Sequence, residues 1–239
     1  MQNKQVQFKD WGIAQDYEEI WAEQEKLLAD NLAIKSANRA KEKAGDPKLE
    51  MTHNHLFFVE HPHVYTLGRS GHLENLLASQ AFLDQIEATF VKTNRGGDIT
   101  YHGPEQLVGY PVLDLENFKS DIHWYMRNLE EIIIRTLADF GLASERSKGE
   151  TGVWLDVGKS SARKICAMGV KASRWVTIHG FALNVNPDMR YFDYIVPCGI
   201  QDKAVTSMEI ELGEKVSMDR VKKSVLKHFE AVFEAEMIF

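Results

Sequence analysis

RGGDITYHGPEQLVGYPVLDL, residues 95–115, joins a glycine-rich turn to two extended, strand-like pieces. Arg95, Gly96 and Gly97 form the turn, where glycine permits backbone conformations that let a ligand approach main-chain N–H groups closely. An ordinary hairpin connection is the alternative interpretation. No Gly-Lys-Ser or Gly-Lys-Thr follows the turn, so it does not predict an ATP phosphate-binding loop. Its continuation through His102 favours a binding site.

Helical and strand-like stretches alternate irregularly on both sides of this segment. Helices are expected at residues 12–44, 73–86 and 122–140, and in the tail that begins at Met218. Strands are expected at residues 55–68, interrupted by a turn at Pro62, at 89–94, and as three strands within 152–185. Long helices mixed with strands, without regular βαβ alternation, predict an α+β or mixed α/β fold.

Composition and charge narrow the classes of protein. Of the 239 residues, 44% are hydrophobic and 26% charged, which is typical of a folded globular chain. The formal net charge of −7 argues against nucleic acid as a general partner. Two cysteines are too few for a disulfide scaffold, and neither a secretory signal nor a membrane-length apolar run is present. We therefore expect a cytoplasmic protein in a reducing compartment, with no membrane partner.

Histidines before and after Pro62 suggest a metal site at first sight. His53 and His55 would point the same way on a strand, as would His61 and His63 without the proline. No cysteine or carboxylate completes a tetrahedral set at ordinary ligand spacing. We expect no metal ion and no cofactor.

Cys198 lies at a chain corner, between Pro197 and Gly199. A cysteine kept only for packing more often lies within an apolar strand or helix. Either this turn merely contains a cysteine, or it holds out a thiol that reacts. A free thiol is mostly protonated at pH 7, so a nucleophile would need a neighbouring base or cation. The residues alone do not place such a group beside Cys198.

Lys164 is the most unusual residue of the expected strand RKICAMGV, residues 163–170. On a regular strand it shares a face with Cys166, and the strand is apolar on both sides of it. It is either a charge at a strand edge or end, or a partly desolvated lysine whose lowered pKa permits proton exchange near neutrality. His102 and His179 are the other candidate bases in the sequence.

Five segments in order resemble the lipoyl(octanoyl) transferases, which are octanoyl-[acyl-carrier-protein]:protein N-octanoyltransferases. They are EHPHVYTLGRSG, RGGDITYHGPEQLVGYPVLDL, GVWLDVG, RKICAMGVKASRWVTIHGFALNV and PCGI. The resemblance covers about residues 55–210. It implies a catalytic domain like that of biotin and lipoate protein ligases, with a mixed β-sheet and flanking helices.

The resemblance also implies a reaction and its residues. Cys198 would attack the octanoyl thioester of acyl carrier protein, and Lys164 would lower the effective pKa of that thiol and act as general acid and base. The acyl group would pass to a lysine of lipoyl domains in 2-oxoacid dehydrogenase complexes or of the glycine cleavage H protein. The implied substrate-binding residues are Arg95, Gly96, Gly97, Asp98, Ile99, Thr100, Tyr101, His102, Ala167, Met168, Gly169, Gly180, Phe181 and Ala182.

Two features depart from the family pattern. Glu105 stands where the family commonly has glycine, so a positive φ there would strain the turn by roughly 1 kcal/mol or more. The basic stretch at residues 35–48 resembles an insertion, and it is either a solvated loop or a docking site for the acidic carrier protein.

Three rival interpretations remain. An ATP-dependent lipoate or biotin ligase would share the fold without needing a nucleophilic cysteine, and a binding protein could keep only the acyl slot. Cys166 could in principle replace Cys198 as the reactive thiol, although it is better explained as a small apolar strand residue.

We expect a single catalytic domain over residues 1–239, with a larger part at 1–185 and a smaller one at 186–239.

Overall fold

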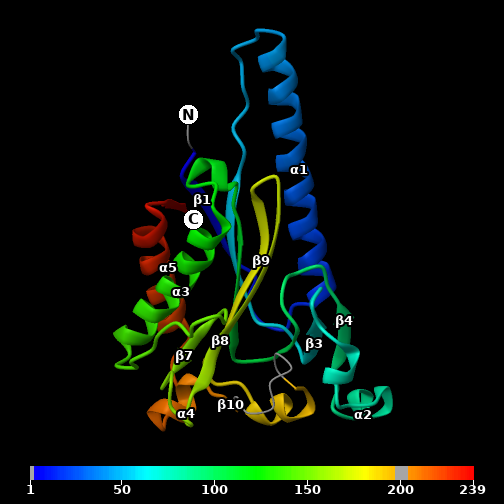
Figure 1. Ribbon diagram of the computed structural model, residues 1–239, viewed down its shortest axis with the longest axis vertical. Coiled ribbons are helices and arrows are strands. Elements are labelled where there is room, and N and C mark those ends of the chain that lie inside the picture. The colour runs from blue at the N-terminus through cyan, green and yellow to red at the C-terminus, as the bar shows by residue number, and fades with distance from the viewer. Residues whose placement is uncertain (1–2, 197–203) are drawn as a thin grey trace.

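The computed structural model describes residues 3–196 and 204–239. Within these ranges the chain forms two β-sheets (Figure 1). The larger sheet has the strand order β10-β8-β9-β6-β2-β1-β11, with β7 also paired to β8. Its strands are β1 Gln5–Asp10, β2 Asn54–Val59, β6 Gln106–Val112, β7 Val153–Leu155, β8 Arg163–Ser173, β9 Val176–Asn184, β10 Ala204–Val205 and β11 Glu236–Ile238. The smaller sheet has the order β4-β3-β5, formed by β3 Val64–Leu67, β4 Thr89–Lys92 and β5 Ile99–His102.

Both sheets are supported by helices on their outer faces. The helices are α1 Tyr17–Lys43, α2 Gln80–Gln85, α3 Ile122–Asp139, α4 Met208–Leu212 and α5 Met218–Phe233. Short 3₁₀ turns occur at η1 Leu73–Asn75, η2 Leu115–Asn117 and η3 Met189–Tyr194. In Figure 1, α3 and α5 lie side by side on one side of the larger sheet, and α1 rises along the other. The expected mixed sheet with flanking helices is confirmed. No described helix combines the length and the apolar character that crossing a membrane requires.

Strand β2 shows why the larger sheet has a hydrophobic core on each face. Leu56 and Phe58 belong to the core that includes residues of α3 and α5, whereas Phe57 and Val59 belong to the core that includes residues of α1. Successive strand residues point to opposite faces, so a sheet covered on both sides needs a nearly continuous apolar strand. The run LFFV meets that requirement, and all four side chains are buried.

Local capping sets the ends of the longest helices. Asp16, Asp121 and Ser217 precede α1, α3 and α5, and each side chain accepts a hydrogen bond from a backbone N–H of the first turn. Such an N-cap contributes about 1 kcal/mol. Gly141 follows α3 with a φ of +79°, as a glycine just after a helix often has. The expected helix at residues 122–140 is therefore confirmed.

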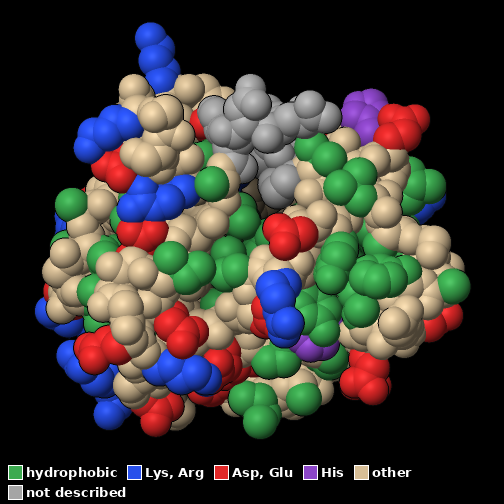
Figure 2. All heavy atoms as spheres, turned by 90° about the horizontal axis from the view of Figure 1, so that it is seen from below, with side chains coloured by type: hydrophobic (Ala, Val, Ile, Leu, Met, Phe, Trp, Pro, Cys, Tyr) green, Lys and Arg blue, Asp and Glu red, His purple; other side chains and the backbone are tan. Residues whose placement is uncertain are grey.

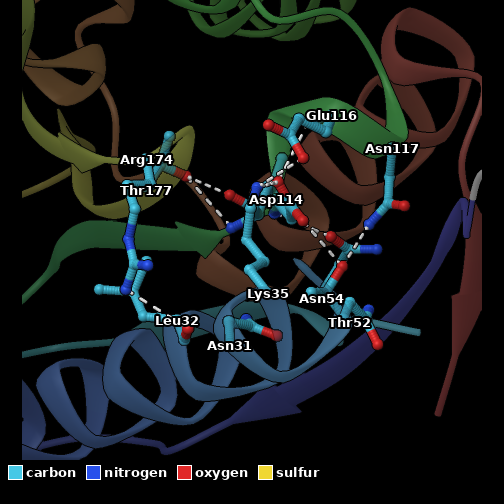
Figure 3. A network of polar contacts seen from close by, with 12 residues as sticks. Asn31, Leu32, Lys35, Thr52, Asn54, Asp114, Glu116, Asn117, Arg174 and Thr177 are labelled. Carbon is cyan, nitrogen blue, oxygen red and sulfur yellow. Dashed lines mark hydrogen bonds and ion pairs between the residues drawn. The ribbon is translucent and has the colours of Figure 1, made fainter. Parts of the chain in front are cut away.

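The second half of α1 is fixed to the body at Lys35 by a largely buried polar network (Figure 3). Lys35 Nζ donates to Asp114 Oδ1 at 2.7 Å and lies 2.9 Å from a carboxylate oxygen of Glu116. The hydroxyl of Thr52, on the segment that returns from α1 to β2, donates to the other Asp114 oxygen at 2.9 Å. The stretch at residues 35–48 is thus not simply a solvated loop. Helix α1 continues through Lys43, and the Lys35 side chain is largely buried.

One local expectation was wrong, and one alternative interpretation is excluded. Residues 73–86 form η1 and the short α2 rather than one helix, because Leu76 and Leu77 instead pair with the chain around η3. The turn at 95–97 is not a hairpin connection. It joins β4 to β5, and β3 lies between those two strands in the smaller sheet.

Candidate functional site

A cavity of about 570 Å³ opens where strands β6, β8 and β9 face the loop between β4 and β5. Its size is that of a small-molecule site. Thirteen of the fourteen expected substrate-binding residues line it, namely Arg95, Gly96, Gly97, Asp98, Ile99, Thr100, His102, Ala167, Met168, Gly169, Gly180, Phe181 and Ala182. Tyr101 does not. It is fully buried in the core of the smaller sheet, with its hydroxyl 2.7 Å from His63 Nδ1.

The glycines of the cavity wall are packed against other backbone. A Cβ on Gly169 would lie 2.7 Å from the carbonyl oxygen of Gly96, and one on Gly180 would lie 2.1 Å from that of Gly109. The N–H of Gly96 also donates to the carbonyl of Val170 at 2.9 Å. Glycine is therefore required at these positions because the loop and the strands approach each other closely. The lack of side chains there also leaves space beside the cavity wall.

Arg95 braces the loop from inside the protein. Its Nη2 donates to the carbonyl and hydroxyl oxygens of Thr66, at 2.6 and 2.9 Å, and its Nη1 donates to the Gly96 carbonyl at 3.1 Å. Asp98 accepts from Asn75 Nδ2 at 2.7 Å. These contacts tie the 95–98 loop to β3 and η1, with the buried guanidinium as a positive charge behind it.

His102 is neutral and its tautomer is set by its neighbour. The Gln106 side chain donates through Nε2 to Tyr101 O and Asn184 Oδ1, at 3.1 and 2.9 Å, so its Oε1 must accept. The proton of His102 is then on Nδ1, 2.9 Å from Gln106 Oε1. Burial, together with nearby His61 and Arg95, holds the pKa of His102 well below its usual value.

His179 lies further along the cavity with a strained backbone. Its φ is +60° inside β9, and its ring Nε2 lies 2.9 Å from Asn94 Oδ1. Burial, reinforced by the positive charge of Arg95, lowers the pKa of His179 to about 3. Both candidate bases of the sequence therefore line the cavity as neutral imidazoles.

Lys164 lies in the same cavity, at the beginning of β8. It is not on a sheet edge, because β8 pairs there with both β7 and β10, and Val205 is its partner on β10. Its Nζ stands 4.6 Å from the centre of the Trp154 ring, a cation–π contact. The adjacent Thr206 N–H donates to the Lys164 carbonyl at 2.9 Å, which fixes the strand beside it.

The two cysteines differ in what can be described. Cys198 lies outside the described residues. Cys166 is fully buried in the core next to α3 and is not part of the cavity wall. The expectation that it shares a face with Lys164 was wrong, because the pairing with β7 shifts register there: Val153 pairs with Cys166 but Trp154 with Lys164. Burial raises the pKa of the Cys166 thiol.

Several residues of the cavity wall come from elements that no sequence pattern connects with the site. Tyr17 begins α1 and stacks on His102 with ring centres 5.7 Å apart. Burial raises the pKa of the Tyr17 hydroxyl to about 12. Other members of the wall are Val108, Met126, Asn184, Phe192, Val205 and the loop at 149–151. Figure 2 shows the molecule from the end where β10 lies in Figure 1, with hydrophobic side chains gathered on this face.

Glu105 adopts the conformation that glycine would favour. Its φ is +60°, and its N–H donates to Glu60 Oε2 at 2.9 Å. Its carboxylate meets Lys215 Nζ at 3.0 Å on the surface. The turn between β5 and β6 therefore keeps its geometry at a cost of about 1 kcal/mol. Among residues 3–196 and 204–239, no three His, Cys, Asp or Glu side chains are grouped to hold a metal ion.

Known proteins support both the fold and the family. Residues 16–230 match the family model described as the lipoyl protein ligase A/B catalytic domain. A bipartite lipoate protein ligase from Thermoplasma acidophilum has a TM-score of 0.68 at 16% identity, covering 100% of this chain and 88% of that one. A lipoate-protein ligase A bound with ATP has a TM-score of 0.63 at 15% identity, with 100% and 90% coverage. These structures confirm the lipoate ligase type of catalytic fold.

Relatives in sequence are much closer. Octanoyltransferase of Christiangramia forsetii is 58% identical over 236 residues, covering 98% of each chain. That of Flavobacterium johnsoniae is 59% identical over 238 residues, covering 99% of this chain and all of its own. That of Bacteroides fragilis is 48% identical over 214 residues, covering 90% and 91%. The chain therefore belongs to the octanoyltransferases of the lipoyl protein ligase A/B family, and it is an acyltransferase.

Proposed function

We propose that this protein transfers the octanoyl group of octanoyl-acyl carrier protein to the ε-amine of a specific lysine on lipoyl domains, through a thioester on Cys198. The observation that carries the proposal is that the expected acyl-binding residues and Lys164 line the same cavity, which has apolar walls at Met168 and Phe181. Val205 lies in β10, the strand that follows Cys198, and pairs with Lys164. This pairing supports the proposed association of Lys164 with Cys198. Burying most of the methylenes of the chain offers several kcal/mol, at about 0.8 kcal/mol each.

The reaction has two acyl-transfer steps. In the first, the thiolate of Cys198 attacks the thioester carbonyl, the carrier thiolate leaves and takes up a proton, and an acyl-enzyme thioester forms. In the second, the neutral amine of the acceptor lysine attacks that thioester, an amide forms, and the Cys198 thiol is regenerated with the proton that the amine loses. Lys164 stabilises the thiolate as a cation and shuttles the proton in both steps. Conversion of a thioester to an amide is downhill, so the cycle needs no ATP.

The acceptors are expected to be the lipoyl domains of 2-oxoacid dehydrogenase complexes and the glycine cleavage H protein. The Thermoplasma ligase was described together with its E2 lipoyl domain, which supports an acceptor of this class. The chain is expected to work in the cytoplasm, where carrier protein and acceptors are made.

The decisive test is the intact mass of the protein after incubation with octanoyl-acyl carrier protein, without acceptor or ATP. We expect a gain of one octanoyl group that hydroxylamine removes. The adduct should be absent in Cys198→Ser and present in Cys166→Ser, which is the matched thiol control. Absence of any adduct with a competent donor, with amide product that appears only when octanoate, ATP and Mg²⁺ are added, would instead establish a ligase.

The role of Lys164 is tested by the pH dependence of Cys198 alkylation. Lys164→Ala should move the apparent pKa of the thiol upward, because a stabilising cation is lost. Trp154→Leu should move it in the same direction by less, since it removes only the ring against which the ammonium packs, a contact of roughly 0.5–2 kcal/mol. An unchanged profile in Lys164→Ala would remove the lysine from the mechanism.

A further inference from the structure

Glu25 lies in the first third of α1, and its carboxylate is contacted by three parts of the protein. Oε1 accepts from Asn94 Nδ2 at 2.6 Å and from the indole Nε1 of Trp21 at 3.1 Å. Lys171 Nζ on β8 donates to both oxygens, at 2.9 and 3.1 Å. Partial burial alone would raise the pKa of Glu25, but these donors lower it below its ordinary value, so the side chain is anionic.

The carboxylate dictates how Asn94 is oriented. A carboxylate only accepts hydrogen bonds, so Asn94 must turn its NH₂ group to Glu25 and its carbonyl oxygen to His179. His179 Nε2 lies 2.9 Å from that oxygen and must carry the ring proton. The backbone N–H of His179 is held from α1 as well, donating to Gln24 Oε1 at 2.8 Å. One charge on α1 thus fixes an amide rotamer and a histidine tautomer.

Each residue held in this way adjoins a different wall of the cavity. Asn94 precedes the loop that begins at Arg95, Lys171 follows Val170 on β8, and His179 precedes Gly180 on β9. The loop and β8 also meet directly through the Gly96 N–H bond to the Val170 carbonyl. Glu25, Asn94, Lys171 and His179, here called the relay, therefore connect three walls of the cavity. None of the four is an expected acyl-binding residue, although Asn94 and His179 directly precede Arg95 and Gly180, which are.

We propose that Glu25 is a positioning residue that sets the spacing of the acyl cavity, and thereby the length of acyl chain that is accepted. The inference rests on the proposed function, because it takes the cavity as the acyl site. A relay that holds the three walls at one separation excludes longer chains. Loosening it lets the loop move away from β8 and β9 and admits them.

The test compares Glu25→Gln with Asp30→Asn, which neutralises an exposed carboxylate on the same helix. Glutamine keeps the size of the side chain but loses the charge that faces Lys171 and gains a donor beside Asn94. The ratio of kcat/KM for octanoyl- over dodecanoyl-acyl carrier protein should fall about five-fold or more in Glu25→Gln, mostly through KM, and stay unchanged in Asp30→Asn. Equal ratios in the two variants would overturn the proposal.

Two further readouts separate positioning from simple stabilisation. Asn94→Ala should give the same loss of discrimination, and the double variant should add nothing to it, because both changes interrupt one relay. Additive effects would contradict this. Long-range ¹H–¹⁵N spectra should show His179 protonated on Nε2 in the parent chain and a mixture of tautomers in Glu25→Gln, whereas loss of stability alone would leave the tautomer unchanged.

Failure of the proposed function gives a different result from failure of this inference. If the parent chain forms no octanoyl-enzyme and binds neither octanamide nor dodecanamide by calorimetry, the proposed function falls and this inference with it. If the parent chain transfers octanoyl groups but Glu25→Gln keeps the full preference for eight carbons, only this inference falls.

Discussion

Gly169 on β8 lies so close to Gly96 that a Cβ added to it would stand 2.7 Å from the Gly96 carbonyl oxygen and 3.2 Å from Arg95 Cδ. The reverse substitution meets less resistance, since a Cβ on Gly96 would lie 3.3 Å from the Val170 carbonyl oxygen. Both glycines lie at the same contact between the β4–β5 loop and β8, but only Gly169 lacks room for a Cβ.

Gly169→Ala should therefore destabilise the protein by about 1–3 kcal/mol, because the loop must move off β8 to relieve the overlap. Gly96→Ala requires a shift of only a few tenths of an ångström and should cost much less. Urea unfolding of the two variants measures the difference. Equal free energies of unfolding would mean that the loop and β8 do not pack as closely as described.

Glu105 holds a left-handed backbone conformation, with a φ of +60°. Glu105→Gly relieves the left-handed conformation but makes the unfolded chain more flexible, a cost of about 0.4–1 kcal/mol, so its net effect should be small. Glu105→Val should be less stable than Glu105→Gly by about 1–2 kcal/mol, because a β-branched residue is disfavoured at positive φ. Both variants lose the ion pair with Lys215, so their comparison in urea isolates the backbone. A valine variant as stable as the glycine variant would show that the turn has no such constraint.

Acid should destabilise the fold through its buried histidines. Burial lowers the pKa of His61 to about 4 and that of His179 to about 3, whereas in the unfolded chain both are near 6.5. The folded state then binds fewer protons below about pH 6.5. The free energy of unfolding should thus be fully present above that pH and fall by up to ~1.4 kcal/mol per pH unit for each histidine as the pH drops toward the folded pKa.

Urea midpoints between pH 7 and pH 5 measure this slope. His61→Gln should reduce this slope by up to ~1.4 kcal/mol per pH unit, the contribution of one proton, because glutamine does not titrate. Glutamine can also donate a hydrogen bond, as His61 Nδ1 does to the Gln15 carbonyl at 2.7 Å. His123→Gln, at an exposed position on α3, is the control. A slope that His61→Gln leaves unchanged would show that His61 takes up its proton equally in both states.

The sequence was informative wherever local chemistry decides the structure. The apolar stripe of residues 122–140 and the glycine at its end predict α3, and the glycine and histidine pattern of the β4–β5 loop predicts most of one cavity wall. Strand β1, residues Gln5–Asp10, was missed because it alternates weakly and is defined by pairing with β2 and with β11 at the other end of the chain. Pairing between such distant segments leaves little local signal.

The shape of the site depended on features that no short window contains. The register shift opposite Trp154 separates Lys164 from Cys166, although regular alternation would put them on one face. Glu25 and Tyr17 reach the cavity region because α1 crosses the sheet, and their own neighbours in sequence are ordinary helical residues. Motifs therefore predicted which residues gather, and tertiary packing determined which of them face the cavity.

The two thiols should differ sharply in reactivity. Cys166 is fully buried, its sulfur lies 3.6 Å from the Ala167 carbonyl oxygen, and burial raises its pKa, so almost none of it is thiolate at neutral pH. Limiting iodoacetamide should therefore modify one cysteine in the native protein, identified as Cys198 by peptide mapping, and both cysteines in denaturant. Cys166→Ala should cost only about 1 kcal/mol and leave the rate of acyl-enzyme formation unchanged. Native labelling at Cys166, or loss of the octanoyl adduct in Cys166→Ala, would make Cys166 on β8 the nucleophile and overturn the assignment of Cys198.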